Sequence, residues 1–301
     1  MSDKMSIEKV AKIVVIGAGT MGHGIAQVAA MAGFQTTLCD LDAQSLERAT
    51  NAVRGNLDKG VSRGKVDAGT AKEALARLST STSVDEAATD AQVVVEAVYE
   101  SLELKQKIFK ALAKSAPSDA ILATNTSSLS LESIANSLEA GARPRFVGMH
   151  FFNPVHIMKL VEIVRHQGTS ENSVAVAKQL AEKMGKSPIV VADSPGFASS
   201  RLGVVIGLEA MRMVEEGVAS AEDIDTAMKL GYGHPMGPLE LTDHVGLDVR
   251  LAISQYLTEV MGDKYAPPSI LKNKVESGAL GKKTGQGFYT WKDGKKQSAD
   301  S

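Results

Sequence analysis

The sequence has 301 residues, of which 44% are apolar and 23% charged, and its formal net charge at pH 7 is −2. This composition is typical of a globular protein of about two domains, and it excludes an electrostatic case for nucleic acid or a membrane surface as partner. Cys39 is the only cysteine, so no intrachain disulfide can form. Residues 1–10 lack the apolar core of a signal peptide, and no 18-residue apolar stretch occurs, so we expect a cytoplasmic location.

The first predicted elements are a strand, a glycine-rich turn and a helix. A strand is predicted over residues 12–16, because Ile13 to Ile16 form an apolar run typical of a buried parallel strand, and Gly17, Gly19 and Gly22 follow at the G-x-G-x-x-G spacing. Such a turn lets a pyrophosphate approach the backbone at the start of the helix, where free N–H groups favour an anion. The sequence therefore predicts a dinucleotide site, and the predicted contacts are Gly17, Ala18, Gly19, Thr20, Met21 and Gly22.

A second predicted strand, residues 34–39, leads to an acid. Asp40 lies 23 residues after Gly17, near the offset of a carboxylate that accepts hydrogen bonds from the ribose. A carboxylate there repels a 2′-phosphate, and no Arg or Lys follows before Arg48, so we expect NAD rather than NADP. The alternative is a similar turn in a flavodoxin-like domain that binds no dinucleotide.

Strand and helix signals alternate through the first two-thirds of the chain, which predicts an α/β fold with a mostly parallel, Rossmann-type sheet. Residues 43–59 and 67–78 indicate two polar helices, which form an inserted helical arm without a strand. Further strands are predicted at residues 92–96, 120–123, 146–149, 159–164 and 188–192, with a helix at 173–184 before the last of them.

The pattern changes at Asp193 and is helical beyond it. We therefore predict an NAD-binding domain over residues 1–192 and an all-helical substrate and dimerisation domain over residues 193–301. Its helices are predicted at residues 197–216, 221–229, 238–260 with an interruption near Gly246, and 270–277. Apolar residues of its first helix favour a homodimer over packing within one subunit; they include Leu202, Val205, Ile206, Leu208 and Met213.

Polar residues follow two of the predicted strands, at the edge where parallel sheets bind ligands. Asn125 and Ser127 follow one strand, and His150 and Asn153 follow the next. Glu162 lies twelve residues after His150, within reach if the chain makes a tight return. A histidine can take the proton of an alcohol, a carboxylate behind it fixes the tautomer, and NAD accepts the hydride. This pattern predicts alcohol oxidation with His150 as base.

Each of these assignments has a structural alternative. A histidine at a strand end is more often a surface or capping residue than a base, and Glu162 could pair with Lys159 or Arg165 instead. No His or Cys cluster has metal-ligand spacing, so we expect no metal. The remaining histidines have no specific context and are assigned no role: His23, His156, His166, His234 and His244.

Five stretches of the sequence resemble the 3-hydroxyacyl-CoA dehydrogenases, and most of all the short-chain 3-hydroxybutyryl-CoA dehydrogenases. They are Thr124-Asn-Thr-Ser-Ser-Leu, Gly148-Met-His-Phe-Phe-Asn-Pro, Lys159-Leu-Val-Glu-Ile-Val, Asp193-Ser-Pro-Gly-Phe and Gly233-His-Pro-Met-Gly-Pro-Leu-Glu. The resemblance extends from Lys12 to about Trp291. It implies a Rossmann-type domain, a helical dimerisation domain, and NAD-linked oxidation of an (S)-3-hydroxyacyl-CoA to the 3-ketoacyl-CoA, an activity of fatty acid metabolism.

The resemblance also implies roles for single residues. His150 and Glu162 match the base and its supporting acid, and Ser127 matches the hydroxyl beside the substrate 3-oxygen. The implied further cofactor contacts are Glu100, Lys105, Asn125, Asn153 and Lys283, and the positions nearest to the CoA contacts on the arm are Asn56 and Arg63. This chain has Ser200 where the family usually has Asn; serine keeps a donor and an acceptor but is shorter, which bears on the substrate pose rather than on the chemistry.

Two other functions stay open on the sequence. One is a dehydrogenase of a free hydroxy acid, such as a sugar acid, with the same His–Glu pair. The other is a catalytically silent NAD-binding protein, which the serine at position 200 motivates. The basic link at residues 61–65 favours CoA, whose phosphates need cations.

Overall fold

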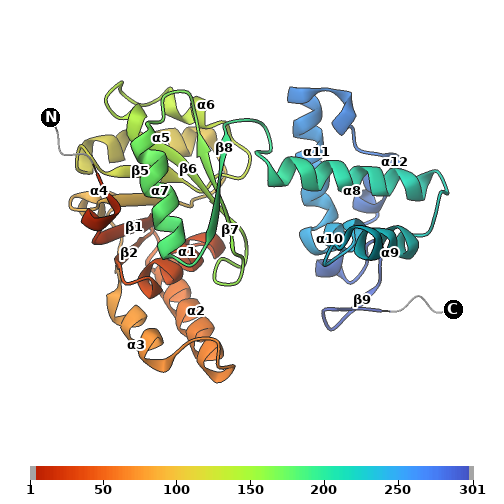
Figure 1. The fold of residues 1–301 in the computed structure, drawn as a ribbon, viewed down its shortest axis with the longest axis horizontal. Coiled ribbons are helices and arrows are strands. Elements are labelled where there is room, and N and C mark those ends of the chain that lie inside the picture. Colours follow the sequence, from red (N-terminus) through yellow and green to blue (C-terminus); the bar gives the residue numbers. More distant parts are fainter. Residues whose placement is uncertain (1–4, 298–301) are drawn as a thin grey trace. The chain divides into compact units, whose positions relative to one another are not determined.

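The computed structural model describes residues 5–297, so the expectation about a leader segment falls partly outside the described residues. The chain divides into two compact units, Met1–Ser194 and Pro195–Ser301 (Figure 1). The division falls two residues after the boundary expected from the sequence. Within residues 5–297, none of the helices combines the length and apolar character that crossing a membrane requires.

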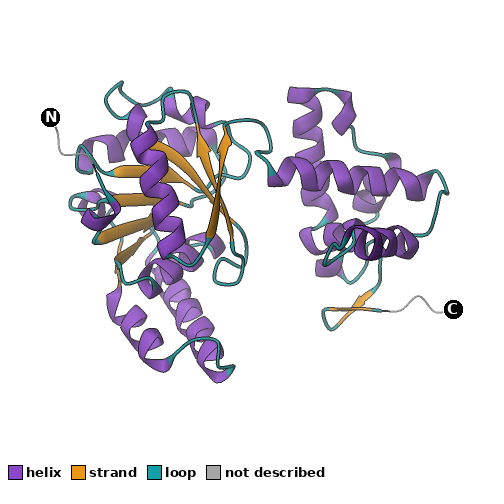
Figure 2. Cartoon of the chain, viewed as in Figure 1, coloured by secondary structure: helices purple, strands orange, loops and turns teal. Residues whose placement is uncertain are grey.

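An eight-stranded sheet forms the centre of the first unit, in the order β3-β2-β1-β4-β5-β6-β7-β8 (Figure 2). Its strands are β1 (Lys12–Ile16), β2 (Gln35–Cys39), β3 (Leu78–Ser81), β4 (Val93–Glu96), β5 (Ile121–Thr124), β6 (Phe146–Phe151), β7 (Leu160–Arg165) and β8 (Ser187–Ala192). All neighbouring strands pair in parallel except β6 and β7, which are antiparallel. The predicted mostly parallel sheet is thereby confirmed.

Helices cover both faces of this sheet. They are α1 (Thr20–Met31), α2 (Ala43–Ser62), α3 (Ala68–Arg77), α4 (Val84–Ala88), α5 (Leu102–Ser115), α6 (Leu131–Ala135) and α7 (Glu171–Lys183), with single 3-10 turns at η1 (Ile7–Lys9) and η2 (Arg143–Arg145). Alternate strand residues such as Val147 and Met149 pack with Ile25 of α1 and Leu180 of α7 in one apolar core. The intervening residues face the opposite side, where Phe146 packs edge-on against Phe109 of α5 at 4.7 Å.

The inserted arm consists of α2 and α3. The Asp42 side chain caps α2 by accepting from the N–H groups of Gln44 and Ser45, which fixes where the helix begins. The predicted link at residues 61–65 is partly wrong, because α2 continues through Ser62. Val53 and Leu57 of α2 are buried against Ala71 and Ala74 of α3, and Ala30 of α1 belongs to the same small core, which joins the arm to α1.

The strand β3 is a correction to the expectation of no strand in residues 43–79. Its four residues are mostly polar and half-buried or exposed, so it has no apolar run that marks it in the sequence. It forms by pairing with β2 at the edge of the sheet, in a register that begins with Thr36 opposite Leu78. The short helices α4 and α6 are likewise additions, and both begin at a serine whose side chain caps the first turn.

The second unit is helical, as predicted. Its helices are α8 (Ser199–Glu215), α9 (Ala221–Tyr232), α10 (Pro238–Val245), α11 (Leu247–Met261) and α12 (Ser269–Glu276), with 3-10 turns at η3 (Asp263–Tyr265) and η4 (Lys282–Thr284). A small hairpin of β9 (Trp291–Lys292) and β10 (Lys295–Lys296) corrects the all-helical expectation. Asp243 holds this hairpin and the residues that lead into it. Its carboxylate accepts from the Phe288 and Tyr289 N–H groups and from the Trp291 indole.

The apolar residues expected on α8 separate into two groups. Leu208 is buried in the core of the second unit, and Met213 packs against that core. Leu202 is 62% exposed, Val205 39% and Ile206 36%. The helix therefore has one face in its own core and a second apolar face at the surface of the unit.

Candidate active site

The glycine turn between β1 and α1 has the geometry that a pyrophosphate needs. Gly17 has φ of +101°, and its N–H donates to the Cys39 carbonyl at 2.7 Å. A Cβ on Gly22 would lie 1.7 Å from the Gly17 oxygen, so helix and turn pack too closely for a side chain. A Cβ on Gly19 would meet nothing within 4 Å, and no described side chain caps α1 at Gly19. The open space and the uncapped first turn fit an anionic dinucleotide.

Asp40 stands at the end of β2 beside this turn. Its Oδ2 accepts from the Ala18 N–H at 2.7 Å, and its Oδ1 accepts from the Asp42 N–H at 3.0 Å. These two bonds fix the carboxylate next to the turn, at the edge of the sheet where the sequence predicted a ribose contact.

His150 and Glu162 form a buried pair. They are register partners on the antiparallel strands β6 and β7, and Nδ1 of the imidazole lies 2.7 Å from Oε2 of the carboxylate. Glu162 is fully buried and His150 is 6% exposed. The alternative partners of Glu162 are engaged elsewhere, since Lys159 donates to the Gly185 carbonyl and Arg165 pairs with Glu171. The tight return that the twelve-residue spacing required is therefore present.

A second buried acid lies on the same face of the sheet, and the sequence reading missed it. Glu96 ends β4 and is the register partner of Thr124 on β5. Its Oε1 accepts from the Lys105 ammonium and from the Val98 N–H, both at 2.7 Å, and its Oε2 accepts from the Thr124 hydroxyl at 2.7 Å. Lys105 is 1% exposed. The sequence does contain a signal for Glu96, because an acid in an otherwise apolar strand requires a buried partner, as it does for Glu162.

Glu100 connects this buried network to the loop that carries Ser127. It pairs with Lys105 at 3.2 Å and accepts from the Ser127 N–H at 3.1 Å and the Ser128 hydroxyl at 3.2 Å, as well as from Thr126. Burial by itself would raise the pKa of Glu100, but the Lys105 charge and these hydrogen bonds outweigh burial and lower its pKa. Glu100 is therefore an ionised anchor for the loop.

The carboxyl ends of β5 and β6 bring the predicted chemical residues together. The Asn125 side chain follows β5 and accepts from the Phe151 N–H at 2.9 Å, which joins the ends of the two strands. Ser127 is exposed in the loop after β5, and Asn153 is exposed two residues after the end of β6. These residues share one edge of the sheet with His150, which lies one residue before the end of β6.

The remaining predicted residues lie elsewhere. On the arm, Asn56 donates to the Gln27 side chain at 3.2 Å, and Arg63 is exposed where α2 ends. Ser200 and Lys283 belong to the second unit, where the Lys283 ammonium lies 2.6 Å from both carboxylate oxygens of Asp248. Among the described residues, no group of three or more His, Cys, Asp or Glu is arranged to hold a metal ion.

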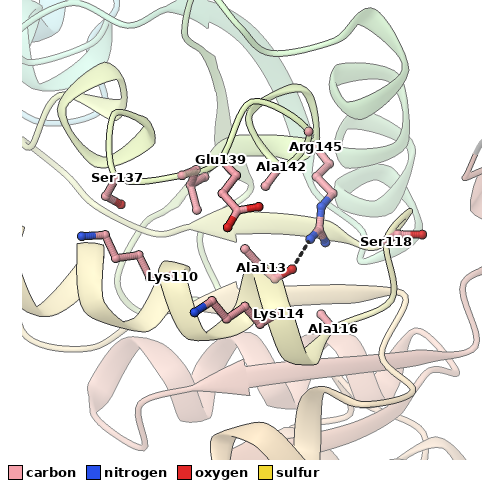
Figure 3. A pocket seen from close by; sticks show the side chains of 11 residues that line it. Lys110, Ala113, Lys114, Ala116, Ser118, Ser137, Glu139, Ala142 and Arg145 are labelled. Carbon is pink, nitrogen blue, oxygen red and sulfur yellow. Dashed lines mark hydrogen bonds between the residues drawn. The ribbon is translucent and has the colours of Figure 1, made fainter.

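A surface pocket of about 650 Å³ lies away from these residues (Figure 3). Lys110, Lys114 and Glu139 line it, and Arg145 closes it by donating to the carbonyls of Ala113, Pro117 and Ala120. Arg145 directly precedes β6, so the pocket lies where the parallel strands begin, at the edge opposite His150. It has no part in the site described above.

A dinucleotide turn at the start of a Rossmann-type sheet, with a histidine–carboxylate pair at the same edge, defines an NAD-dependent dehydrogenase. Residues 12–194 match the family model for the NAD binding domain of 3-hydroxyacyl-CoA dehydrogenase, and residues 196–291 match the model for its C-terminal domain. The chain therefore belongs to the 3-hydroxyacyl-CoA dehydrogenase family, and NAD is its cofactor.

Relatives with known names are similar over almost their whole length. The probable 3-hydroxybutyryl-CoA dehydrogenase of Bacillus subtilis is 43% identical over 95% of this chain and 99% of its own. The human mitochondrial hydroxyacyl-coenzyme A dehydrogenase is 41% identical over 93% of this chain and 91% of its own. Among solved structures, the (S)-3-hydroxybutyryl-CoA dehydrogenase of Ralstonia eutropha superimposes with a TM-score of 0.89 at 38% identity, over 95% of this chain and all of the other.

Proposed function

We propose that this protein oxidises (S)-3-hydroxyacyl-CoA to 3-ketoacyl-CoA with NAD, and catalyses the reverse reduction, with 3-hydroxybutyryl-CoA as its substrate. The observation that carries the proposal is the buried His150–Glu162 pair at the same sheet edge as the glycine turn. The short acyl chain is supported by the names of the Bacillus and Ralstonia relatives. The alternative of a free hydroxy acid has no comparable support.

The pair supplies acid–base catalysis in this proposal. Nδ1 faces Glu162, which holds that nitrogen as the donor and so leaves Nε2, across the ring, as the atom that takes the proton of the 3-hydroxyl group. Glu162 also stabilises the imidazolium that results. NAD, when bound, supplies the acceptor for the hydrogen that leaves C3 with its electron pair. Ser127, in the loop anchored by Glu100, donates to the 3-oxygen and orients it.

The other predicted contacts complete the site. Asp40 accepts from the ribose hydroxyls and excludes NADP. For the cofactor we propose Gly17, Ala18, Gly19, Thr20, Met21, Gly22, Glu100, Asn125, Asn153 and Lys283, and for the substrate Ser200, Asn56 and Arg63. Lys105 is buried between two carboxylates, so its contribution to cofactor binding acts through Glu100.

We further infer a cytoplasmic homodimer that associates through the second unit and serves fatty acid metabolism. The support for the dimer is the exposed apolar face of α8 at Leu202, Val205 and Ile206. Light scattering of the purified protein tests it: a dimer that Leu202→Glu converts to monomers is expected, and a monomeric parent protein contradicts it.

An enzyme assay tests the catalytic proposal. NADH formation is expected from 3-hydroxybutyryl-CoA and not from free 3-hydroxybutyrate or a sugar acid. NADP is expected to support far lower kcat/KM than NAD, and Asp40→Ser, which removes the repelling charge, is expected to narrow that difference. Turnover of the free acid in preference to the thioester would overturn the substrate, and equal use of both cofactors would overturn the role of Asp40.

A further inference from the structure

A group of basic side chains surrounds the loop between β6 and β7. We name it the basic junction and define it as His23 on α1, His156 and Lys159 in the loop, and Lys186 directly before β8. Burial, and then the charges of Lys186 and His23, lower the pKa of His156. Burial and the charge of Lys159 lower the pKa of Lys186 to about 8. The four groups therefore lie within electrostatic reach of one another.

The basic junction has no acidic counterpart in the part of the chain that the structure describes. Its hydrogen-bond acceptors are backbone carbonyls, namely Gly19 for His23 at 2.9 Å, Gly185 for Lys159 at 3.3 Å, and Val155 and Met158 for Lys186, the latter at 3.0 Å. Basic side chains that hold down one another's pKa, with no carboxylate among them, gain from a bound anion, because the anion favours their protonated forms. His156 and Lys159 are exposed and can reach such an anion.

The junction is held in a fixed position against α1. Val155 is 2% exposed, and a Cβ on Gly24 would lie 2.8 Å from the Val155 Cβ, so loop and helix are in close contact. The buried Lys186 ammonium holds the same loop from the other side through two carbonyls. His23 directly precedes Gly24 and His156 directly follows Val155, so this contact brings the two imidazoles to one place.

The position of the junction points to the substrate rather than to a separate ligand. His156 lies six residues after His150, in the loop that follows β6. On the other side, Gln27 lies one helical turn after His23 and accepts from Asn56 on the arm. Figure 1 shows the loop between β6 and β7 beside α1, with the α2–α3 arm projecting from the same end of the sheet. The junction is therefore joined directly to the strand that carries His150 and, through α1, to the arm on which CoA contacts are proposed.

We propose that the basic junction binds a phosphate group of the CoA part of the substrate, with His156, Lys159 and His23 as donors and Lys186 as their support. This inference rests on the proposed function. A phosphate prefers several charge-assisted donors, and imidazole and ammonium groups supply them. The pyrophosphate of the dinucleotide has the same chemistry, but the glycine turn already provides for it, so we assign the junction to CoA.

Steady-state kinetics with two thioesters test this assignment. The variants are His156→Gln with Lys159→Gln, and His23→Gln; Lys114→Gln, which removes one exposed cation at the opposite edge of the sheet, is the control. Each is assayed with 3-hydroxybutyryl-CoA and with 3-hydroxybutyryl-pantetheine, which has no phosphate. For the double variant, the KM for the CoA ester is expected to rise about ten-fold, the equivalent of one charge-assisted hydrogen bond, with kcat, the KM for the pantetheine ester and the KM for NAD unchanged.

Each other result contradicts the assignment in a distinct way. A rise in the KM for NAD alone would assign the junction to the dinucleotide, and an equal rise for both thioesters would show an effect on the acyl or pantetheine part. An unchanged KM for the CoA ester would remove the junction from substrate binding while leaving the enzymatic function intact. A parent protein inactive on both thioesters would overturn the proposed function itself.

Discussion

Two histidine–glutamate pairs with a buried imidazole lie in the described part of the first unit, and one of them stands at the carboxyl edge of the sheet. His150 and Glu162 pair at the carboxyl edge of the sheet at 2.7 Å. His166 follows β7 at the other edge, and its Nδ1 lies 3.1 Å from Oε2 of Glu132. The residue types and the burial of the imidazoles are similar, so the pair itself does not define an active site.

The surroundings of the two rings differ. In the His166 pair, Nε2 lies 3.2 Å from the Arg143 carbonyl, and Nδ1, which faces Glu132, lies 3.1 Å from the Gly168 nitrogen. Both ring nitrogens therefore serve to join two surface turns. The His150 pair is set by strand register and shares its edge with Asn125, Ser127 and the glycine turn. The place of such a pair in the sheet, and not its residue types, therefore distinguishes the two: one joins turns, and the other lies beside the dinucleotide turn.

Replacement of the two histidines should give the largest contrast. His150→Gln is expected to lower kcat by on the order of 10²–10⁴, because it removes the proposed general base while keeping a donor toward Glu162. His166→Gln, the matched control, is expected to retain kcat on 3-hydroxybutyryl-CoA. Near-normal turnover in the His150 variant, or an equal loss of kcat in both variants, would contradict the distinction between the two pairs.

Replacement of Glu162 should lower kcat and replacement of Glu132 should not, as for the two histidines. Glu162→Gln is expected to lower kcat by at least about 10-fold, because the imidazolium loses the charge that stabilises it. It should also change the pH dependence of kcat, which a purely structural loss would not do. Glu132→Gln should leave both the rate and its pH profile as they are. A Glu162 variant with the parent pH profile would contradict the proposed support of the base.

The His166 pair should matter for the stability of the fold rather than for turnover. His166→Gln is expected to reduce the free energy of unfolding by about 1–3 kcal/mol, since buried partners on two turns lose their hydrogen bonds. Denaturant unfolding, monitored by circular dichroism, measures this. If the variant unfolds like the parent protein, the structural role assigned to His166 is wrong.

The smallest effect concerns acid stability. Burial would raise the pKa of Glu132, but His166 and Arg143 outweigh it and hold this pKa below its ordinary value of 4.5. The stability that results is complete above pH 4.5 and is lost as the pH falls through the lowered pKa. Glu132→Gln should therefore flatten the fall in unfolding free energy below pH 4.5, whereas Glu103→Gln, a change at an exposed acid on α5, should not. Equal slopes in the two variants would argue against this contribution.

The sequence predicted the parts of the fold that are coded locally. The strand at 12–16, the glycine turn and α1 are recognisable because apolar run, glycine spacing and helical period follow one another directly. The contact between His150 and Glu162 was also accessible, because twelve residues allow a return and a buried acid requires a partner. The interruption at Gly246 separated two helices as expected, and its φ is +104°.

The parts that the sequence did not predict depend on distant residues. Strand β3 is polar and exists because β2 offers it an edge. Glu132 and His166 are 34 residues apart, and no spacing rule joins them. Glu96 and Thr124 meet only through strand register, and His23 and His156 come within electrostatic reach only because Gly24 leaves room for Val155. Tertiary packing decides these contacts, and a one-dimensional pattern does not contain it.

The antiparallel pairing of β6 with β7 has a consequence for how this enzyme can change. The proposed base and its supporting acid face each other because they are register partners, His150 opposite Glu162. Successive side chains of a strand alternate between its two faces, so inserting or deleting a single residue in either strand would turn one partner to the far side of the sheet. Length variation in this hairpin is therefore tolerable only in the connection between its strands, or in steps of two.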